Sequence, residues 1–122
     1  MGYSNELANG KVDLKPYTLV AGVTPEIDLE GGTLCGVLNE TELTSTYFTI
    51  SVARLPTAEG GVYCTVIDPD LSGADRKFYV ATTSDNHYTP ISPLITAGFK
   101  YCKLNYDQSE TPTVYIARRS LQ

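Results

Sequence analysis

Hydrophobic and polar residues alternate along short runs of this chain, and no run has the 3.6-residue period of an amphipathic helix. The clearest alternation covers residues 47–53, where Phe48, Ile50 and Val52 share one face and hydroxyl side chains occupy the other. Glycine- and proline-bearing segments separate this run from the next. The pattern therefore predicts short β-strands joined by turns.

The same reading predicts seven or eight antiparallel strands, at residues 17–23, 25–29, 33–38, 47–53, 62–67, 77–82, 99–106 and 113–118. The strands at 47–53 and 62–67 are joined by a glycine-bearing link and should form a hairpin. Within the second of them, Val62, Cys64 and Val66 should share one face.

Residues 88–104 predict a crossover between two sheets. Pro90 and Pro93 each lack a backbone donor and push the preceding residue towards an extended conformation, which disfavours a helix. The apolar residues of this segment must then be buried by a loop that passes from one strand to another: Ile91, Leu94, Ile95 and Phe99. Such a crossover is typical of a β-sandwich.

We therefore expect an all-β fold, a single β-sandwich of jelly-roll type, over residues 17–122. Nine tyrosines, seven prolines and ten glycines in 122 residues agree with strands and turns. Residues 1–16 are polar and have no periodicity, so they predict an extended N-terminal arm.

The net charge and the lengths of the apolar runs argue against two classes of partner, nucleic acid and membrane. A net charge of −5 argues against nucleic acid, which binds clustered lysine and arginine. The adjacent pair Arg118 and Arg119 is expected to be a solvated strand end. The longest apolar run, residues 17–23, is too short to cross a membrane, and residues 1–7 lack the features of a signal peptide. We expect a soluble domain made in a reducing compartment.

The three cysteines, Cys35, Cys64 and Cys102, are widely spaced in strand-like runs. They are expected to be buried free thiols, with one disulfide plus a spare thiol as the alternative. The sequence holds no Cys-x-x-Cys, and His87 is its single histidine, so no metal site is predicted.

Two segments have some character of a chemical site. Residues 68–73 begin like a calcium loop, but Tyr79 stands where the bidentate glutamate belongs, so an acidic turn is predicted and weak calcium binding is the alternative. His87 lies two residues from Asp85, but no nucleophile stands out beside this pair. We therefore predict no catalytic residue, no cofactor and no enzyme.

The tyrosines have two possible roles. A sugar-binding module would use two or three of them as a stacking platform. On the strands they would serve equally well as anchors of a subunit interface. Because they are spread over strands and loop edges, we favour the interface: Tyr47, Tyr63, Tyr79, Tyr88, Tyr101, Tyr106 and Tyr115.

Several segments, taken in order, resemble a family of small tailed-phage virion proteins. They are LEGGTLCGV at 29–37, VYCTVID at 62–68, YTPISP at 88–93, AGFKYCKL at 97–104 and TVYIARR at 113–119. The resemblance covers about residues 27 to 119 and rests on order and spacing, with no catalytic signature. It implies a capsid decoration, or cement, protein: a jelly-roll-like oligomer on the outer surface of the phage head, synthesised in the host cytoplasm.

The expected partners are the major capsid protein and further copies of this chain, with a trimer favoured and neither nucleic acid nor membrane involved. The first strand could lie at a sheet edge, so the arm could reach an adjacent subunit, and deleting residues 1–16 should leave the domain folded. The alternative function is a carbohydrate-binding module of a head fibre or tail. The candidate interface residues are Tyr3, Leu7, Tyr17, Leu19, Tyr88, Pro90 and Pro93.

Overall fold

The computed structural model is all-β, as the alternation predicted, and it describes residues 12–20, 22–40, 47–79, 86–106 and 113–119. Its strands are β1 (Val12–Thr18), β2 (Ile27–Asp28), β3 (Thr33–Asn39), β4 (Tyr47–Ala53), β5 (Cys64–Thr65), β6 (Ile67–Asp68), β7 (Ala74–Asp75), β8 (Phe78–Tyr79), β9 (His87–Pro90), β10 (Tyr101–Tyr106) and β11 (Thr113–Arg119). Two 3-10 turns, η1 (Thr57–Glu59) and η2 (Pro69–Leu71), lie between β4 and β7. With three residues each, they are the only helical segments described, and no helix among these residues could span a membrane.

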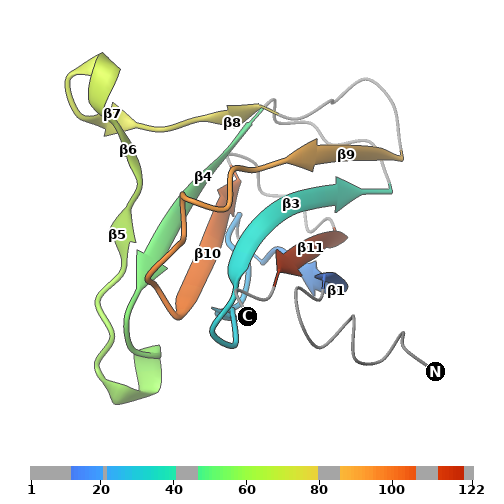
Figure 1. The fold of residues 1–122 in the computed structure, drawn as a ribbon, viewed down its shortest axis with the longest axis horizontal. Helices are drawn as coiled ribbons and strands as arrows, with labels where there is room; N and C mark the ends of the chain where they lie inside the picture. The colour runs from blue at the N-terminus through green and yellow to red at the C-terminus, as the bar shows by residue number, and fades with distance from the viewer. Residues whose placement is uncertain (1–11, 21, 41–46, 80–85, 107–112, 120–122) are drawn as a thin grey trace.

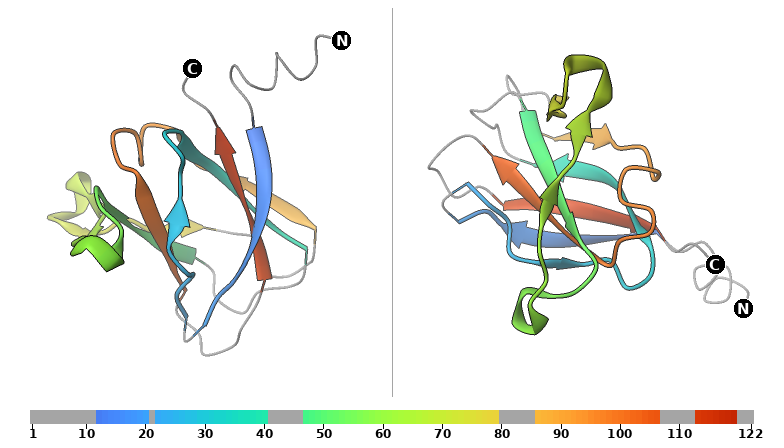
Figure 2. Two further views of the ribbon diagram at one scale, coloured as in Figure 1. Left: turned by 90° about the horizontal axis from the view of Figure 1, so that it is seen from below. Right: turned by 90° about the vertical axis from the view of Figure 1, so that its left-hand side faces the viewer.

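Two antiparallel sheets share one core (Figures 1 and 2). The four-stranded sheet has the order β1-β11-β3-β9, and the five-stranded sheet has the order β2-β10-β4-β5 with β8 also paired to β4. β6 and β7 form a separate two-stranded ribbon. Both sheets contribute to the buried cluster: Leu19, Ile27, Leu29, Leu34, Val37, Phe48, Ile50, Val52, Ile91, Cys102, Leu104, Tyr106, Val114 and Ile116. The jelly-roll connectivity stays a prediction.

The first strand differs from the prediction. β1 begins at Val12 and pairs with β11 along its whole length, so residues 12–16 are not part of an arm. At a sheet edge only one face of a strand meets the core, so the strand can carry polar residues and a proline such as Pro16. Residues 1–11, with Tyr3 and Leu7, lie outside the described residues.

A second difference is β9, which was predicted to be part of the loop and crossover. It pairs with β3 and forms the other edge of the four-stranded sheet, where a proline is tolerated. The crossover that follows buries Ile91 and packs Ile95 and Phe99 against the core, as expected. Leu94 is 81% exposed, contrary to the prediction, because it lies in the turn after Pro93 and outside the two layers.

The predicted hairpin of β4 with the following strand is confirmed, although the pairing is short. Only Ser51↔Thr65 and Val52↔Cys64 are matched, and the chain then leaves the sheet edge as an excursion over residues 54–79. Of the three residues expected to share a face, Val66 packs against the core, whereas Val62 and Cys64 are exposed. They are exposed because this segment runs beside the sheet and has no second layer over it (Figure 2).

Candidate docking face on the four-stranded sheet

The register of the four-stranded sheet places eight residues without a formal charge together on its outer face. Residues directly opposite each other on paired strands point to the same side of a sheet. One row across the four strands is Pro16, Tyr115, Leu38 and Tyr88, and the next is Leu14, Ala117, Gly36 and Pro90. The row between them carries Ile116 and Val37, which are in the core. These eight residues, which we call the docking face, therefore point away from the core.

The docking face is accessible at its edges and closely packed at its centre. Leu14 is 51% exposed and Tyr88 is 48% exposed, and both lie on edge strands. Tyr88 lies across Gly36, where an added Cβ would be 2.0 Å from the tyrosine hydroxyl oxygen. That hydroxyl donates to the Cys35 carbonyl oxygen over 3.2 Å. A glycine is therefore required for the ring to lie flat on the sheet.

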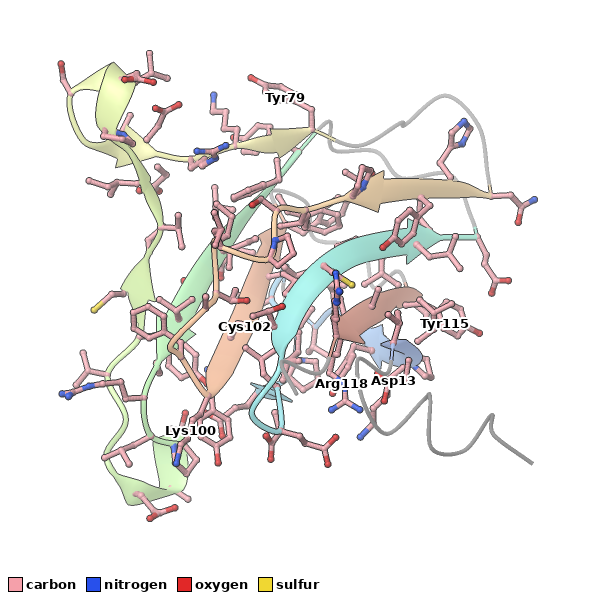
Figure 3. The ribbon with its side chains drawn as sticks, in the orientation of Figure 1. Asp13, Tyr79, Lys100, Cys102, Tyr115 and Arg118 are labelled. Carbon is pink, nitrogen blue, oxygen red and sulfur yellow. The ribbon has the colours of Figure 1, made fainter. Side chains whose placement is uncertain are left out.

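Polar groups border the docking face. Glu40 raises the pKa of Tyr115, first through its negative charge and then through a hydrogen bond between the two side chains. Beyond the tyrosine, the hydroxyls of Thr18 and Thr113 are 2.9 Å apart. Figure 3 shows Tyr115 projecting from β11 on the side away from β10. An apolar centre with a polar rim is the usual anatomy of a protein interface.

Of the described residues that were predicted to form an interface, some lie on the docking face and others lie in or against the core. Tyr88 and Pro90 lie on the docking face, next to strands that the sequence did not associate with them. Leu19 is fully buried in the core, so its prediction as an interface residue is wrong: the run it belongs to follows β1 and turns inward between the sheets. Tyr17 is half-buried against the core, and Pro93 is half-buried in the crossover turn.

Arg118 ties the edge strand β1 to the rest of the molecule. Its Nε and Nη2 donate to the two carboxylate oxygens of Asp13 at 3.0 and 2.6 Å. Its Nη1 donates to the Asp28 carbonyl oxygen and pairs with Glu30, both at 2.7 Å. Figure 3 shows Asp13 and Arg118 together at the end of the sheet. The hydrogen bonding of Arg118 to the Asp13 carboxylate is the largest of the effects that raise the pKa of Arg118.

The prediction of a solvated Arg118-Arg119 pair is therefore wrong for Arg118. Its side chain is 10% exposed, while Arg119 is exposed as expected. Strand alternation places neighbouring residues on opposite faces, so Arg118 shares the core side of β11 with Ile116, and the unbroken pairing of β1 with β11 puts Asp13 directly opposite it. Asp13 is visible in the sequence as a possible acidic partner for an arginine. Only the pairing of β1 with β11 shows that its partner is Arg118.

A different polar cluster lies on the five-stranded sheet. The Glu26 carboxylate accepts hydrogen bonds from the Tyr63 hydroxyl at 2.5 Å and from the Thr57 backbone N–H and hydroxyl at 2.9 Å each. The Lys103 ammonium lies 4.5 Å from the centre of the Tyr63 ring. The hydrogen bond from Tyr63 is the main cause that lowers the pKa of Glu26. This cluster fastens the η1 loop to the sheet.

Three further sites were considered from the sequence: a metal site, the turn at residues 68–73 and His87. Within the described ranges, no group of three or more His, Cys, Asp or Glu could hold a metal ion. The Asp68 carboxylate accepts from the Asp70 backbone N–H at 3.0 Å within the β6–β7 hairpin, so the predicted acidic turn is confirmed. His87 begins β9, and its predicted neighbour Asp85 lies outside the described residues.

The three cysteines are free thiols, as predicted, but they differ in burial. Cys102 is fully buried and burial raises its pKa to about 12, whereas Cys35 is half-buried and Cys64 is exposed on β5. The prediction that all three are buried is therefore wrong for Cys64, because β5 lies at the edge of its sheet.

No match came from known proteins. Searches against protein-family models, curated proteins and solved structures all ended without one. The docking face offers apolar contact area and two sheet edges, which suits it to bind another protein.

Proposed function

We propose that this protein is a structural virion protein, a decoration (cement) protein that binds the outer surface of a phage head and stabilises the lattice of the major capsid protein. The observation that carries the proposal is the docking face, two complete rows of residues without a formal charge on the outside of a sheet. Outer faces of antiparallel sheets are normally polar. A face of this kind marks a surface that another protein covers.

The resemblance of residues 27 to 119 to small tailed-phage virion proteins supplies the identity of the partner in this proposal. A protein that binds the assembled lattice and not the separated subunits stabilises the lattice by its binding free energy. The net charge of −5 suits a location outside the shell, away from packaged DNA. Many copies on one shell make moderate contacts sufficient.

The test is to mix the purified protein with undecorated capsids and to measure binding by co-sedimentation. Leu14→Asp places a charge on the accessible edge of the docking face, and we expect at least tenfold weaker decoration, since burying one leucine in a contact corresponds to about 1.5–3 kcal/mol. Tyr79→Ala is the matched control, because this tyrosine is 65% exposed on β8, away from the docking face.

Both variants should melt within a few degrees of the wild type, because both positions are exposed. Wild-type protein that does not bind capsids would overturn the decoration role. Leu14→Asp binding as tightly as Tyr79→Ala would overturn the docking face as the contact.

A second candidate function is carbohydrate binding, and one observation favours it. The residues of β10 that point away from the core are Tyr101, Lys103 and Asn105, next to Tyr63. Rings and hydrogen-bonding side chains in this combination are what a sugar-binding surface uses. A glycan array tests this function. Binding that is lost in Tyr101→Ala and retained in Leu14→Asp would favour it over decoration, and an array without signal would remove it.

A further inference from the structure

The excursion over residues 54–79 carries large apolar side chains that are exposed. Val62 is 75% exposed and Leu71 is 61% exposed. The excursion pairs with β4 through the short strands β5 and β8, and the Val66 N–H donates to the Ile50 carbonyl oxygen. Large apolar side chains held in water on an ordered segment mark an interaction surface.

The far end of the excursion is a short ribbon that we call the finger, residues 67–75. β6 and β7 pair through Ile67↔Asp75 and Asp68↔Ala74, and η2 closes the turn between them. The Asp68 side chain caps η2, and Ser72 and Gly73 have φ values of 57° and 81° that reverse the chain. This turn holds Leu71 at the tip, next to Asp70.

The near end of the excursion contains a half-open pocket of about 130 Å³, lined by Arg54, Leu55, Gly60, Gly61 and Val62. Two of its lining residues are held together by backbone packing: a Cβ on Gly61 would lie 1.9 Å from the Leu55 carbonyl oxygen. The Glu26 carboxylate fastens the adjoining η1 turn through Thr57. The pocket is therefore already formed in the single chain and does not need a ligand to assemble it.

The finger and the pocket fit each other in size and charge. A cavity of about 150 Å³ holds a benzene molecule, so a 130 Å³ pocket accommodates the four carbons of a leucine side chain. Arg54 at the pocket would face Asp70 beside the inserted leucine. Within one molecule they cannot meet, since η1 and η2 lie at opposite ends of the excursion (Figures 1 and 2).

We propose that the finger of one copy of this chain inserts Leu71 into the pocket of a second copy. Each copy offers one finger and one pocket, so the contact is head-to-tail and builds a closed ring or an open chain of copies. The excursion contributes no residue to the docking face, so this self-association is independent of what that face binds.

The first test measures self-association by sedimentation velocity over a range of protein concentrations. We expect concentration-dependent oligomers for the wild type and at least tenfold weaker association for Leu71→Asp. Leu94→Asp is the matched control, because this leucine is 81% exposed on the crossover and belongs to neither the finger nor the pocket. A wild type that remains monomeric at millimolar concentration would overturn the proposal, as would equal effects of the two leucine variants.

The second test separates a head-to-tail contact from a symmetric one. Leu71→Asp retains an intact pocket, and Val62→Asp retains an intact finger. Neither variant should associate alone, but an equimolar mixture should form heterodimers and no larger species. For the charge pair, Asp70→Arg and Arg54→Asp should each weaken association, and their combination in one chain should restore it. A mixture that stays monomeric, or a combination without rescue, would contradict this pairing.

Discussion

Replacing Asp13 by alanine removes the carboxylate that holds both Nε and Nη2 of Arg118. The arginine keeps its hydrogen bond to the Asp28 carbonyl oxygen and its pair with Glu30, so it does not become a fully unpaired buried charge. It cannot turn freely to water, because its side chain is only 10% exposed. The variant should therefore lose stability without losing the fold.

The size of the effect follows from the exposure of the two partners. Breaking a fully buried ion pair destabilises by about 3–5 kcal/mol, and an exposed pair by about 0–1 kcal/mol. The Asp13 side chain is 31% exposed and Arg118 is 10% exposed, so the pair lies between these limits. We expect a loss of about 2 kcal/mol, which lowers the melting temperature of a domain of this size by roughly 8 °C.

Thermal unfolding followed by circular dichroism measures this loss, with Glu30→Gln as the matched control. Glu30 contacts the same guanidinium, but its side chain is 67% exposed, so its loss should lower the melting temperature by no more than about 4 °C. If the two variants melt together, the bidentate pair does not anchor β1 and the reasoning from exposure fails. Asp13→Asn should fall between alanine and the wild type, because the amide oxygen still accepts one hydrogen bond.

Three further outcomes are expected. From the sequence alone, deleting residues 1–16 was expected to leave the domain folded and to weaken capsid attachment. Because the deletion removes most of β1, it should instead abolish a cooperative melt, and an unchanged melt would show that β1 is dispensable. The pKa of Glu26 is lowered in the folded protein, so this carboxylate stabilises the fold at pH values above its unfolded-state pKa of about 4.3. The stabilisation is lost as the pH falls through the folded-state pKa. Tyr63→Phe should raise the folded-state pKa towards the ordinary range, as measured by a carboxyl NMR titration. An Ellman assay should modify the exposed Cys64 within minutes and Cys102 only after unfolding, and equal rates would contradict the burial.

Local alternation predicted the elements whose two faces differ most. Phe48, Ile50 and Val52 were assigned to the inner face of a strand, and all three are in the core. β9 escaped prediction because a proline-bearing strand is stable only at an edge, and edge positions follow from the order of strands in the sheet. The start of β1 was predicted too late for the same reason, because β1 is the other edge strand of this sheet.

The docking face could not be predicted from the sequence, because its rows are built from four strands that are distant in the chain. Leu38 and Tyr88 meet through the pairing of β3 with β9, Leu14 joins their sheet only through β11, and none of the three stands out within its own segment. The role of Arg118 has the same origin, since its partner lies 105 residues away. The pattern of a short sequence segment indicates whether it forms a strand. Which residues meet on one face of a sheet, or pair by charge, depends on the register between strands.

The pairing of β1 with β11 also has a consequence for how this protein is made. Val12 pairs with Arg119, so the first described strand must wait for the last one before its edge of the sheet can form. A ribosome adds about 5–20 residues per second, which leaves the early strands without this partner for several seconds. During that time Val114 and Ile116 are not yet available to cover the opposite layer of the core. Folding should therefore wait until β11 is available, and it should be slow for a domain of this length because its closing contacts are the most distant ones.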